Sequence, residues 1–200
     1  MFKKVVFITL IFFCFFVEVN AQLLTEEELD TATVYHSLSE ANLNPDFVFV
    51  LDLSKQKLSE FPKDIFNYKN LNVLILAKNK ISKLPDSISS LKYLQIIDVS
   101  KNKLTVLPDG FYQLENLKEV NISGNPITVI SYKIMQLKEL QKFSLWGLPI
   151  EKIPEQILQL PKLEYLDVRQ INISSAETQA ILKKLEGVEI RTTSTCDCGV

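Results

Sequence analysis

Residues 71–81 of the chain read LNVLILAKNKI, and the same pattern returns 23 residues later, at 94–104, as LQIIDVSKNKL. A third copy, LKEVNISGNPI, follows after another 23 residues, at 117–127. Each copy has the form L-x-x-L-x-L-x-x-N-x-L, with aliphatic residues exchanging at the apolar positions. Self-similarity at a fixed period of about 20 to 50 residues is typical of a solenoid, in which each repeat forms one coil.

Six repeat units can be aligned in this register, over residues 48–173. They begin at Val48, Leu71, Leu94, Leu117, Leu140 and Leu163. In each unit positions four and six are apolar, as in Leu74 and Leu76, which predicts a short strand with one buried face. Apolar residues recur at positions eleven, fourteen and eighteen, so the return path should pack on the same core. Because one coil leaves its apolar side chains half covered, stability has to come from stacked neighbours.

This pattern, continued by x-x-L-P-x-x-I-x-x-L, resembles the leucine-rich repeat family. The resemblance implies an α/β solenoid, a right-handed superhelix with a parallel β-sheet on its concave side and helical caps at both ends. It also implies a structural ladder at position nine, where asparagine amides bond backbone groups of adjacent coils that would otherwise be buried without partners. The asparagines at this position are Asn79, Asn102 and Asn125.

The asparagine ladder is incomplete. Gln56 occupies position nine in the first unit, whereas Leu148 and Ile171 occupy it in the fifth and sixth. An aliphatic side chain cannot bond the backbone, so these turns must close differently, and we expect altered loops after Trp146 and Arg169. Two explanations stay open, namely ordinary decay of the repeat toward its end and loops reshaped for binding.

An N-terminal helical cap is predicted at residues 22–47. The segments TEEE, beginning at Thr25, and SLSE, beginning at Ser37, both carry the Ser/Thr-x-x-Glu arrangement of a helix start. They predict two short helices, the second of which ends at Asn44-Pro45 because the residue before a proline disfavours helix.

A C-terminal helical cap is predicted at residues 174–190. The segment SSAE, beginning at Ser174, repeats the helix-start arrangement, and Gly187 marks the end of this helix. Residues 188–190 favour a final strand, which leaves residues 191–200 as a polar tail.

The first 21 residues predict a secretory signal peptide. Lys3 and Lys4 precede an apolar run from Val5 to Val17, and Val19-Asn20-Ala21 provides a cleavage site with small residues. The apolar run is shorter than the roughly 20 residues of a membrane-spanning helix, which disfavours a permanent anchor. We therefore expect export, and a mature protein that is secreted or periplasmic.

Cleavage would change the charge little. Removing Lys3, Lys4 and Glu18 from the 22 basic and 24 acidic residues leaves 20 basic and 23 acidic ones, a net charge near −3. Such a charge gives no general attraction to nucleic acid or to an anionic membrane. We expect neither a nucleic-acid partner nor a membrane span in the mature chain.

Cys196 and Cys198 are the cysteines of the expected mature chain. An oxidising compartment favours pairing, but a bridge across Cys-Asp-Cys would close a strained ring. An oligomer linked by disulfides through either cysteine therefore stays open, beside a pair of tail thiols without a role. Two thiols and the distant His36 make a poor zinc site, so we expect no metal and no cofactor.

No catalytic constellation stands out in the sequence. The single histidine, His36, lies in the expected cap with no Ser or Cys nucleophile beside it. Asp52, Asp98 and Asp167 share position five, but adjacent coils are about 5 Å apart and the unit of Ile75 separates the first two. The pattern offers no pocket that would shift a carboxyl pKa, so an enzyme is not expected.

The exposed face of the sheet consists of positions three, five, seven and eight, and in leucine-rich repeats this concave face is the usual site for protein ligands. In the later units it gathers residue types that dominate interface hot spots. The expected binding residues are Trp146, Tyr165, Arg169, Lys142, Asp167 and Glu119. Trp146 and Arg169 share position seven in adjacent units, which predicts a cation–π contact. Packing of Trp146 over Gly147 and Leu148 is the alternative to a hot spot.

Lysines occupy position eight in the first three units, as Lys55, Lys78 and Lys101. Like charges one strand spacing apart cost a little stability. The column is either a solvated rim that prevents aggregation or a surface for an anionic feature of a partner.

Two functions are compatible with these features. The first is a non-catalytic, secreted recognition module that binds another protein through the concave face. The second is a structural or envelope-associated assembly protein, linked through its C-terminal cysteines or its solenoid ends. Asn121-Ile122-Ser123 and Asn172-Ile173-Ser174 match the glycosylation pattern, and a glycan on Asn121 would occupy the concave face.

Overall fold

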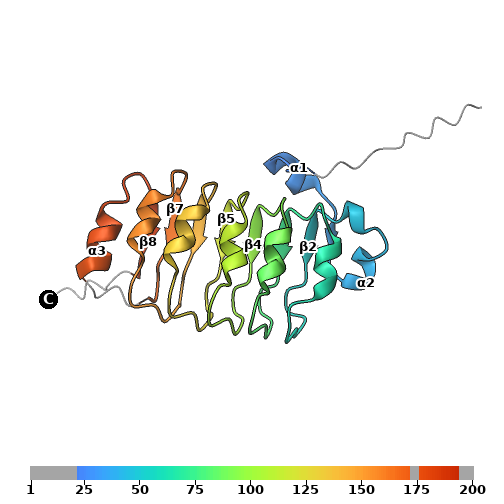
Figure 1. The fold of residues 1–200 in the computed structure, drawn as a ribbon, viewed down its shortest axis with the longest axis horizontal. Helices are drawn as coiled ribbons and strands as arrows, with labels where there is room; N and C mark the ends of the chain where they lie inside the picture. Colours follow the sequence, from blue (N-terminus) through green and yellow to red (C-terminus); the bar gives the residue numbers. More distant parts are fainter. Residues whose placement is uncertain (1–21, 172–175, 194–200) are drawn as a thin grey trace, which may run out of the picture.

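The computed structural model describes residues 22–171 and 176–193. Within these ranges the chain forms eight parallel strands in one sheet, whose order follows the sequence from β1 to β8. The short helices of the return paths lie on the opposite side of the coils from the sheet, whereas α1 lies at the edge of the coils (Figure 1). The predictions for the signal peptide, Asn172, Ser174, Cys196 and Cys198 fall outside the described residues.

The six predicted repeat units each contribute one strand, from β2 to β7. The strand bounds are β1 Val34–Tyr35, β2 Val50–Asp52, β3 Val73–Ile75, β4 Ile96–Asp98, β5 Glu119–Asn121, β6 Lys142–Ser144, β7 Tyr165–Asp167 and β8 Glu189–Arg191. Each of β2 to β6 pairs with the next strand at an offset of 23 residues, as in Val50 opposite Val73 and Val73 opposite Ile96. Equivalent positions therefore form straight rows across the sheet, and the predicted solenoid is confirmed.

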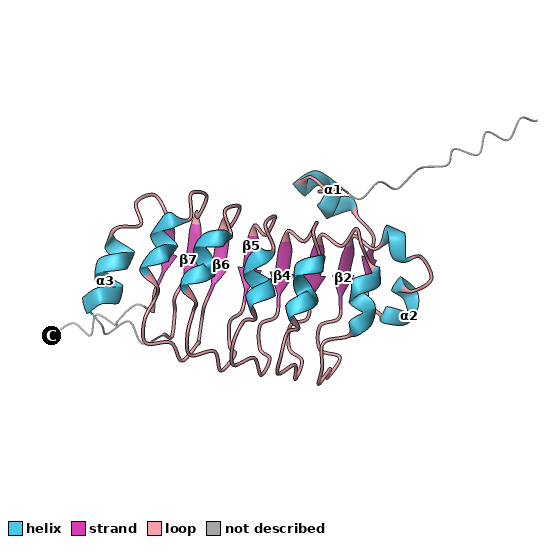
Figure 2. Cartoon of the chain, viewed as in Figure 1, coloured by secondary structure: helices cyan, strands magenta, loops and turns pink. Residues whose placement is uncertain are grey.

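The return paths of the first five repeat coils each contain a 3₁₀ helix (Figure 2). The bounds are η1 Pro45–Phe47 before the first repeat strand, then η2 Lys63–Asn67, η3 Asp86–Ser90, η4 Asp109–Gln113, η5 Tyr132–Gln136 and η6 Glu155–Gln159. Pro62, Pro85, Pro108 and Pro154 directly precede four of these helices. The fixed φ of proline suits the extended residue at a helix start, and its missing N–H costs nothing there.

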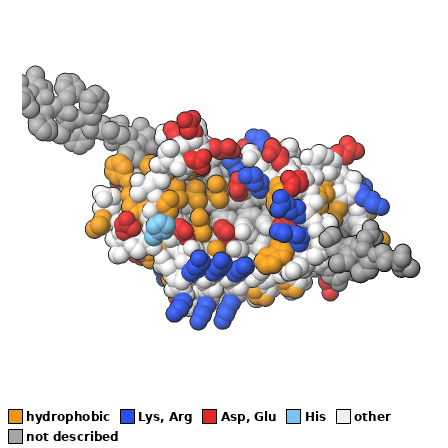
Figure 3. Space-filling model, turned by 180° about the vertical axis from the view of Figure 1, so that it is seen from behind, with side chains coloured by type: hydrophobic (Ala, Val, Ile, Leu, Met, Phe, Trp, Pro, Cys, Tyr) orange, Lys and Arg blue, Asp and Glu red, His pale blue; other side chains and the backbone are white. Residues whose placement is uncertain are grey.

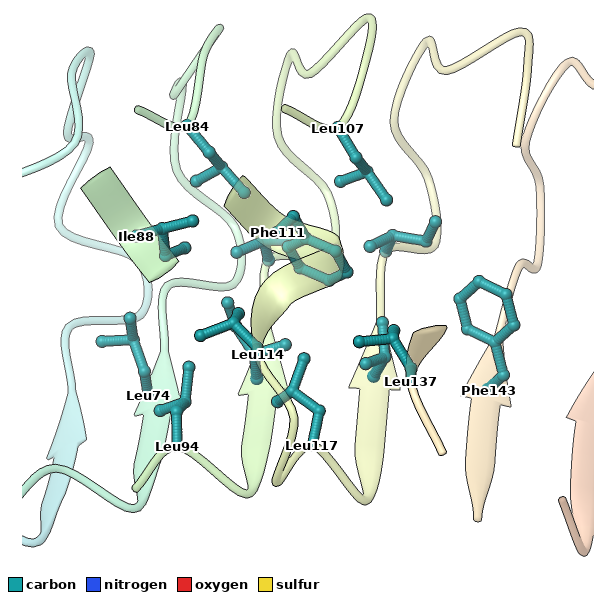
Figure 4. Close-up of a cluster of buried hydrophobic side chains, with 14 of the residues drawn as sticks. Leu74, Leu84, Ile88, Leu94, Leu107, Phe111, Leu114, Leu117, Leu137 and Phe143 are labelled. Carbon is teal, nitrogen blue, oxygen red and sulfur yellow. The ribbon is translucent and has the colours of Figure 1, made fainter. Parts of the chain in front are cut away.

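A single hydrophobic core runs through the whole stack. Leu74 and Phe143 point from their strands toward the return path, and Ile88 and Phe111 point into the same core from the return paths of the second and third repeat coils (Figure 4). All four side chains are fully buried. At about 1.5–3 kcal/mol for each fully buried large apolar side chain, this shared core is the main stabilising term, and no coil could bury its own share alone.

The asparagines at position nine connect adjacent coils as predicted. Asn102 donates from Nδ2 to the carbonyl oxygen of Leu76 in the preceding coil at 2.8 Å and to that of Val99 in its own coil at 3.0 Å. Its Oδ1 accepts the backbone N–H of Ile81 at 3.0 Å. Asn79 and Asn125 repeat this arrangement one coil away on either side.

In the coils without asparagine the backbone keeps the same left-handed turn, so the prediction of altered loops is wrong for the backbone shape but holds for the hydrogen bond that closes the turn. Gly147 and Gln170 adopt left-handed backbone conformations, with φ of 68° and 55°, that match the φ of 58° at Lys78. The N–H of Gly147 bonds the carbonyl of Arg169 in the next coil at 2.9 Å, as the equivalent residues of the earlier coils do. The turn does close differently inside the coil, because the backbone N–H of Leu148 takes the carbonyl of Leu145 at 3.1 Å.

The N-terminal cap contains two helices and a strand that the sequence did not predict. Helix α1, Glu26–Thr31, has the predicted capping box at Thr25, and α2, Leu38–Ala41, begins at Ser37. Between them β1 extends the sheet by pairing with β2. Helix α2 ends at Ala41, before Asn44-Pro45, and the proline starts η1 instead.

The segment before α1 is held against the solenoid by two buried amides. Asn72 accepts the N–H of Leu24 at 3.0 Å, and Gln95 donates to the carbonyl of Leu24 at 2.8 Å. Both amides belong to fully buried side chains at position two, where the strands begin. This clip places α1 beside the start of β4 and β5, next to Gln95, Ile96 and Lys118.

The C-terminal cap comprises α3, Ala176–Lys183, and β8. Helix α3 ends at Lys183, four residues before Gly187, so the prediction that Gly187 marks the helix end is wrong. Gly187 has a φ of 76° and instead belongs to the turn that leads into β8. The strand begins and ends one residue later than predicted, so Arg191 belongs to the sheet and not to the polar tail, and it pairs with Asp167 in the register of β7.

Replacing Asn102 by Ala tests the ladder. We expect the free energy of unfolding to fall by about 2–4 kcal/mol, because buried backbone groups of two coils lose their partners at about 1–3 kcal/mol each. Urea denaturation measures the change. Asn116→Ala is the control, since the amide of Asn116 makes its bond to the carbonyl of Lys92 at the surface and should matter by less than about 1 kcal/mol. Equal losses of unfolding free energy in the two variants would contradict the structural role of the asparagine at position nine.

Candidate functional site

The concave face of the sheet carries an open groove of about 470 Å³. We define its floor as the small side chains at position seven in the first four repeat coils, Ser54, Ala77, Ser100 and Ser123. Position-five residues of the later coils also line the groove, namely Ile75, Asp98, Asn121, Ser144 and Asp167. Lys55, Lys78 and Lys101 stand along one side, and Trp146 and Arg169 line its C-terminal end. Figure 3 shows this hollow face with a row of basic side chains along one edge and acidic side chains near the opposite edge.

The acidic residues at position five are engaged in the turns that end the strands. Oδ1 of Asp52 accepts the N–H of Ser54 at 2.8 Å, and Oδ1 of Asp98 accepts that of Ser100 at the same distance. Asp167 bonds the N–H of Arg169 in the same way at 3.1 Å. Side chains of this kind stabilise a turn by accepting the backbone N–H two residues later, so these carboxylates have a structural role.

Asn121 continues the row at position five. Its Oδ1 accepts the N–H of Ser123 at 3.2 Å, and its Nδ2 donates to Oδ2 of Asp98 at 3.0 Å. The amide nitrogen that would carry a glycan therefore lies within the groove and is bonded to a neighbouring coil. A glycan on Asn121 would break that bond and fill the groove.

Trp146 contacts a lysine two coils away and not its predicted partner. The Nζ of Lys101 lies 5.4 Å from the centroid of the Trp146 ring, within the range of a cation–π contact. Gly124 occupies position eight in the intervening coil, where an added Cβ would lie only 3.3 Å from Cγ of Lys101. The missing side chain at Gly124 leaves the space through which Lys101 reaches the ring.

Arg169 pairs with Asp167 on its own strand. Its Nη2 lies 2.6 Å from Oδ2 of Asp167 and its Nε lies 2.9 Å from Oδ1. This bidentate geometry fixes the guanidinium and the carboxylate relative to each other. The carboxylate is 4% exposed and the guanidinium 44% exposed. Burial raises the pKa of Asp167, but the hydrogen bonds and charge of Arg169 outweigh this effect and hold its pKa below the ordinary value.

The remaining predicted site residues lie in a second, smaller hollow. Lys142 and Glu119 form an ion pair at 2.6 Å, and the hydrogen bond to Glu119 together with its charge raises the pKa of Lys142. The ring of Tyr165 lies 5.3 Å from the guanidinium carbon of Arg191. Glu119, Lys142 and Tyr165 share position three, on the side of the face where the strands begin. The six expected residues therefore form two groups, because the other three line the larger groove.

Other features of the face were missed by sequence reasoning. Glu26 and Asp30 of α1 lie beside Lys118, Glu119 and Lys142, so an acidic helix borders the edge opposite the lysines. The signals were present, because α1 begins with three successive glutamates and Asn72 and Gln95 put amides where two strands begin. The position of α1 depends on a clip between segments 48 or more residues apart, which no local pattern reveals.

The described residues hold no group of three or more His, Cys, Asp or Glu side chains that could bind a metal ion. The side chain of His36 is exposed in the N-terminal cap, directly after β1, and the backbone carbonyl of His36 accepts a hydrogen bond from Nε2 of Gln56 at 2.6 Å. Within residues 22–171 and 176–193, no helix has the length and apolar character needed to cross a membrane.

The repeat coils match a known family. The family profile described as "Leucine rich repeat" matches residues 49–104, 69–127 and 92–150, which together extend over half of the chain. The chain belongs to the leucine-rich repeat family. Leucine-rich repeats commonly mediate contacts between proteins. A comparison with curated proteins finds no match.

Solved structures share this solenoid. A leucine-rich repeat protein of Leptospira interrogans is 30% identical, with a TM-score of 0.65 over 80% of this chain and 48% of the other. An internalin C2 of Listeria monocytogenes is 19% identical, with a TM-score of 0.62 over 75% of this chain and 63% of that chain, which shows the fold alone. This chain spans about half the length of the Leptospira protein.

The pairing of Asp167 with Arg169 predicts a pH-dependent stability. The folded pKa of Asp167 is lowered, so its contribution is present above the unfolded value of about 3.9 and is lost as the pH falls through the folded value. In Arg169→Gln the buried carboxylate loses this partner. We expect the melting temperature of the variant to lie below that of the wild type at pH 7 and the gap to narrow as the pH falls below the unfolded value of about 3.9. A gap that does not narrow as the pH falls would show that Arg169 acts through packing.

Because the lysines at position eight adopt the left-handed backbone conformation, we predict that glycine at this position makes the protein more stable. Lys78 has a φ of 58°, a region that costs a residue with a side chain about 1–2 kcal/mol. Glycine lowers the free energy of unfolding by about 0.5–1 kcal/mol, because it gives the unfolded chain more conformational freedom. Lys78→Gly should therefore raise the free energy of unfolding by about 0.5–1 kcal/mol in urea denaturation. Lys92→Gly is the control, because Lys92 is exposed and its φ is not positive, and it should lose stability.

Proposed function

We propose that this protein is a secreted, non-catalytic recognition module that binds another protein through the concave face of its solenoid. The observation that carries the proposal is the groove of about 470 Å³ with Trp146 at its end. Trp146 is the single tryptophan of the chain, and its ring is partly exposed and faces this groove. Tryptophan and arginine that stand together at the edge of a recess are typical of binding hot spots.

The chemistry of the groove favours binding over catalysis. The position-five carboxylates are held by backbone N–H groups, and Asp167 is paired with Arg169, so they are poorly placed to act as free acids or bases. The small floor residues allow a ligand backbone to approach the sheet closely. A partner that extends past the groove would also meet Tyr165 and the pair of Lys142 and Glu119.

Secretion is supported by the sequence of the first 21 residues, with their basic start, apolar run and small residues at the cleavage site. The alternative of an assembly joined through the solenoid ends has less support. The outer strand β8 carries Glu189 and Arg191, which form an ion pair at 3.2 Å. Charged side chains on an edge strand oppose pairing with another sheet.

Replacing Trp146 by Ala tests the recognition face. A buried interface hot spot contributes about 2 kcal/mol or more, so the variant should bind the captured partner at least about 30-fold more weakly. The partner is obtained by pull-down with the wild-type protein from its own environment and measured by titration. Circular dichroism checks that the variant is folded.

The matched control is Tyr132→Ala. Tyr132 is an aromatic residue that is 60% exposed on η5, away from the sheet. This variant should bind the partner as the wild type does. If Trp146→Ala binds normally, or loses its fold, Trp146 is a packing residue and not the hot spot.

A further inference from the structure

The most concentrated charge on the protein is a lattice of six lysines beside the groove. The inner lysine row is Lys55, Lys78 and Lys101, at position eight. The outer lysine row is Lys57, Lys80 and Lys103, at position ten. All six side chains are exposed, and Figure 3 shows two parallel rows of basic side chains along this edge of the face.

These six lysines have no acidic partner among the described residues, whereas three lysines elsewhere in the repeats do. Lys133 pairs with Asp109, Lys142 with Glu119 and Lys162 with Glu139, each at 2.6 Å. None of the six lattice lysines lies within ion-pair distance of a carboxylate of the described residues. Coils stacked about 5 Å apart therefore bring like charges together without compensation, which is unfavourable.

The backbone adds a second cost at the same residues. Lys55, Lys78 and Lys101 have φ between 54° and 60°, in the left-handed region. The next two coils have Gly124 and Gly147 at this position, with φ of 64° and 68°, where glycine adopts the conformation without strain. Lysine thus stands where the turn itself favours glycine, and strain of this kind points to a role for the side chain.

The inner lysine row forms the wall of the groove and leads to Trp146. The three lysines line the recess together with its small floor, and Lys101 contacts the Trp146 ring. A ligand lying along the floor would have its charges beside the inner row and its end beside the indole. A flat anionic surface, such as a membrane, would touch the lysine tips but could not enter the recess.

We propose that the groove binds an extended acidic peptide segment of the partner protein, with its carboxylates on the inner lysine row and the outer row strengthening the field. This inference rests on the proposed function and specifies the partner's chemistry. The acidic helix α1 at the opposite edge, with Glu26 and Asp30 beside the face, repels such a segment and directs it toward the lysines. The overall charge of −2 conceals this local polarity.

The probe for the test is a fluorescein-labelled peptide of ten glutamates, with a glutamine and serine peptide of equal length as the neutral control. Fluorescence anisotropy measures its binding to the purified protein at 50 and 150 mM NaCl. Emission from the protein's one tryptophan reports whether an unlabelled acidic peptide enters the groove. Anionic and neutral lipid vesicles are titrated in parallel.

Three variants with equal charge changes locate the binding. The first replaces Lys55, Lys78 and Lys101 by Gln, which Gln170 already shows is accepted at a φ of 55°. The second replaces the outer row, Lys57, Lys80 and Lys103, by Gln. The control replaces three exposed lysines away from the lattice, Lys63, Lys69 and Lys83, by Gln.

We expect the acidic peptide to bind and to shift the Trp146 emission, with affinity that falls as salt rises. Loss of the inner row should weaken binding about tenfold, loss of the outer row about threefold, and the control less than about twofold. No binding, or equal losses in all three variants, would overturn the proposal. Binding to anionic vesicles but not to the peptide, with both rows contributing equally, would overturn it in favour of a lipid surface.

The two proposals can fail separately. If the captured partner binds the inner-row variant normally but not Trp146→Ala, recognition by the concave face stands and the acidic segment is wrong. If the peptide depends on the inner row but Trp146→Ala binds the partner normally, the acidic segment on the lysines stands and the proposed role of Trp146 as the hot spot for the partner is wrong.

Discussion

The backbone carbonyl oxygens at position six point into the interior of the coils, where each of them needs a hydrogen-bond donor for the coils to stack. One asparagine satisfies two of them, because Asn102 donates to Leu76 in the preceding coil and to Val99 in its own. Its oxygen also accepts the N–H of Ile81, so a single side chain fixes three backbone groups. This interaction sets the stacking of the central coils, and the straight rows on the concave face follow from it.

The repeat pattern predicted the strands, the core and the asparagine bonds because all three recur with the period. It failed where the structure depends on contacts outside that period. Strand β1 has only two residues and forms by pairing with β2, and Arg191 joins the sheet through β7. The loop after Trp146 keeps its shape because the N–H of Gly147 bonds the next coil, whatever side chain stands at position nine.

The sequence also placed Trp146, Arg169 and Asp167 on a common face but gave the wrong contacts among them. The nearness of Trp146 and Arg169 in the register does not make them partners, because a carboxylate two residues away offers Arg169 two charge-assisted hydrogen bonds. Trp146 then takes the cation that the missing side chain at Gly124 admits. Partner choice is decided by side-chain geometry, which a periodic pattern does not contain.

Because equivalent positions of successive coils form rows, a residue that recurs at an exposed position forms a continuous row on the surface. A lysine repeated at position eight becomes a row with one charge per coil, and a second lysine at position ten doubles it. The left-handed turn itself favours glycine at position eight, as at Gly124 and Gly147. The row ends at Lys101, whose side chain reaches Trp146 across the coil of Gly124, so the charged part of the groove and its aromatic end meet at this boundary. That boundary is what a ligand with a charged stretch and a terminal contact would recognise.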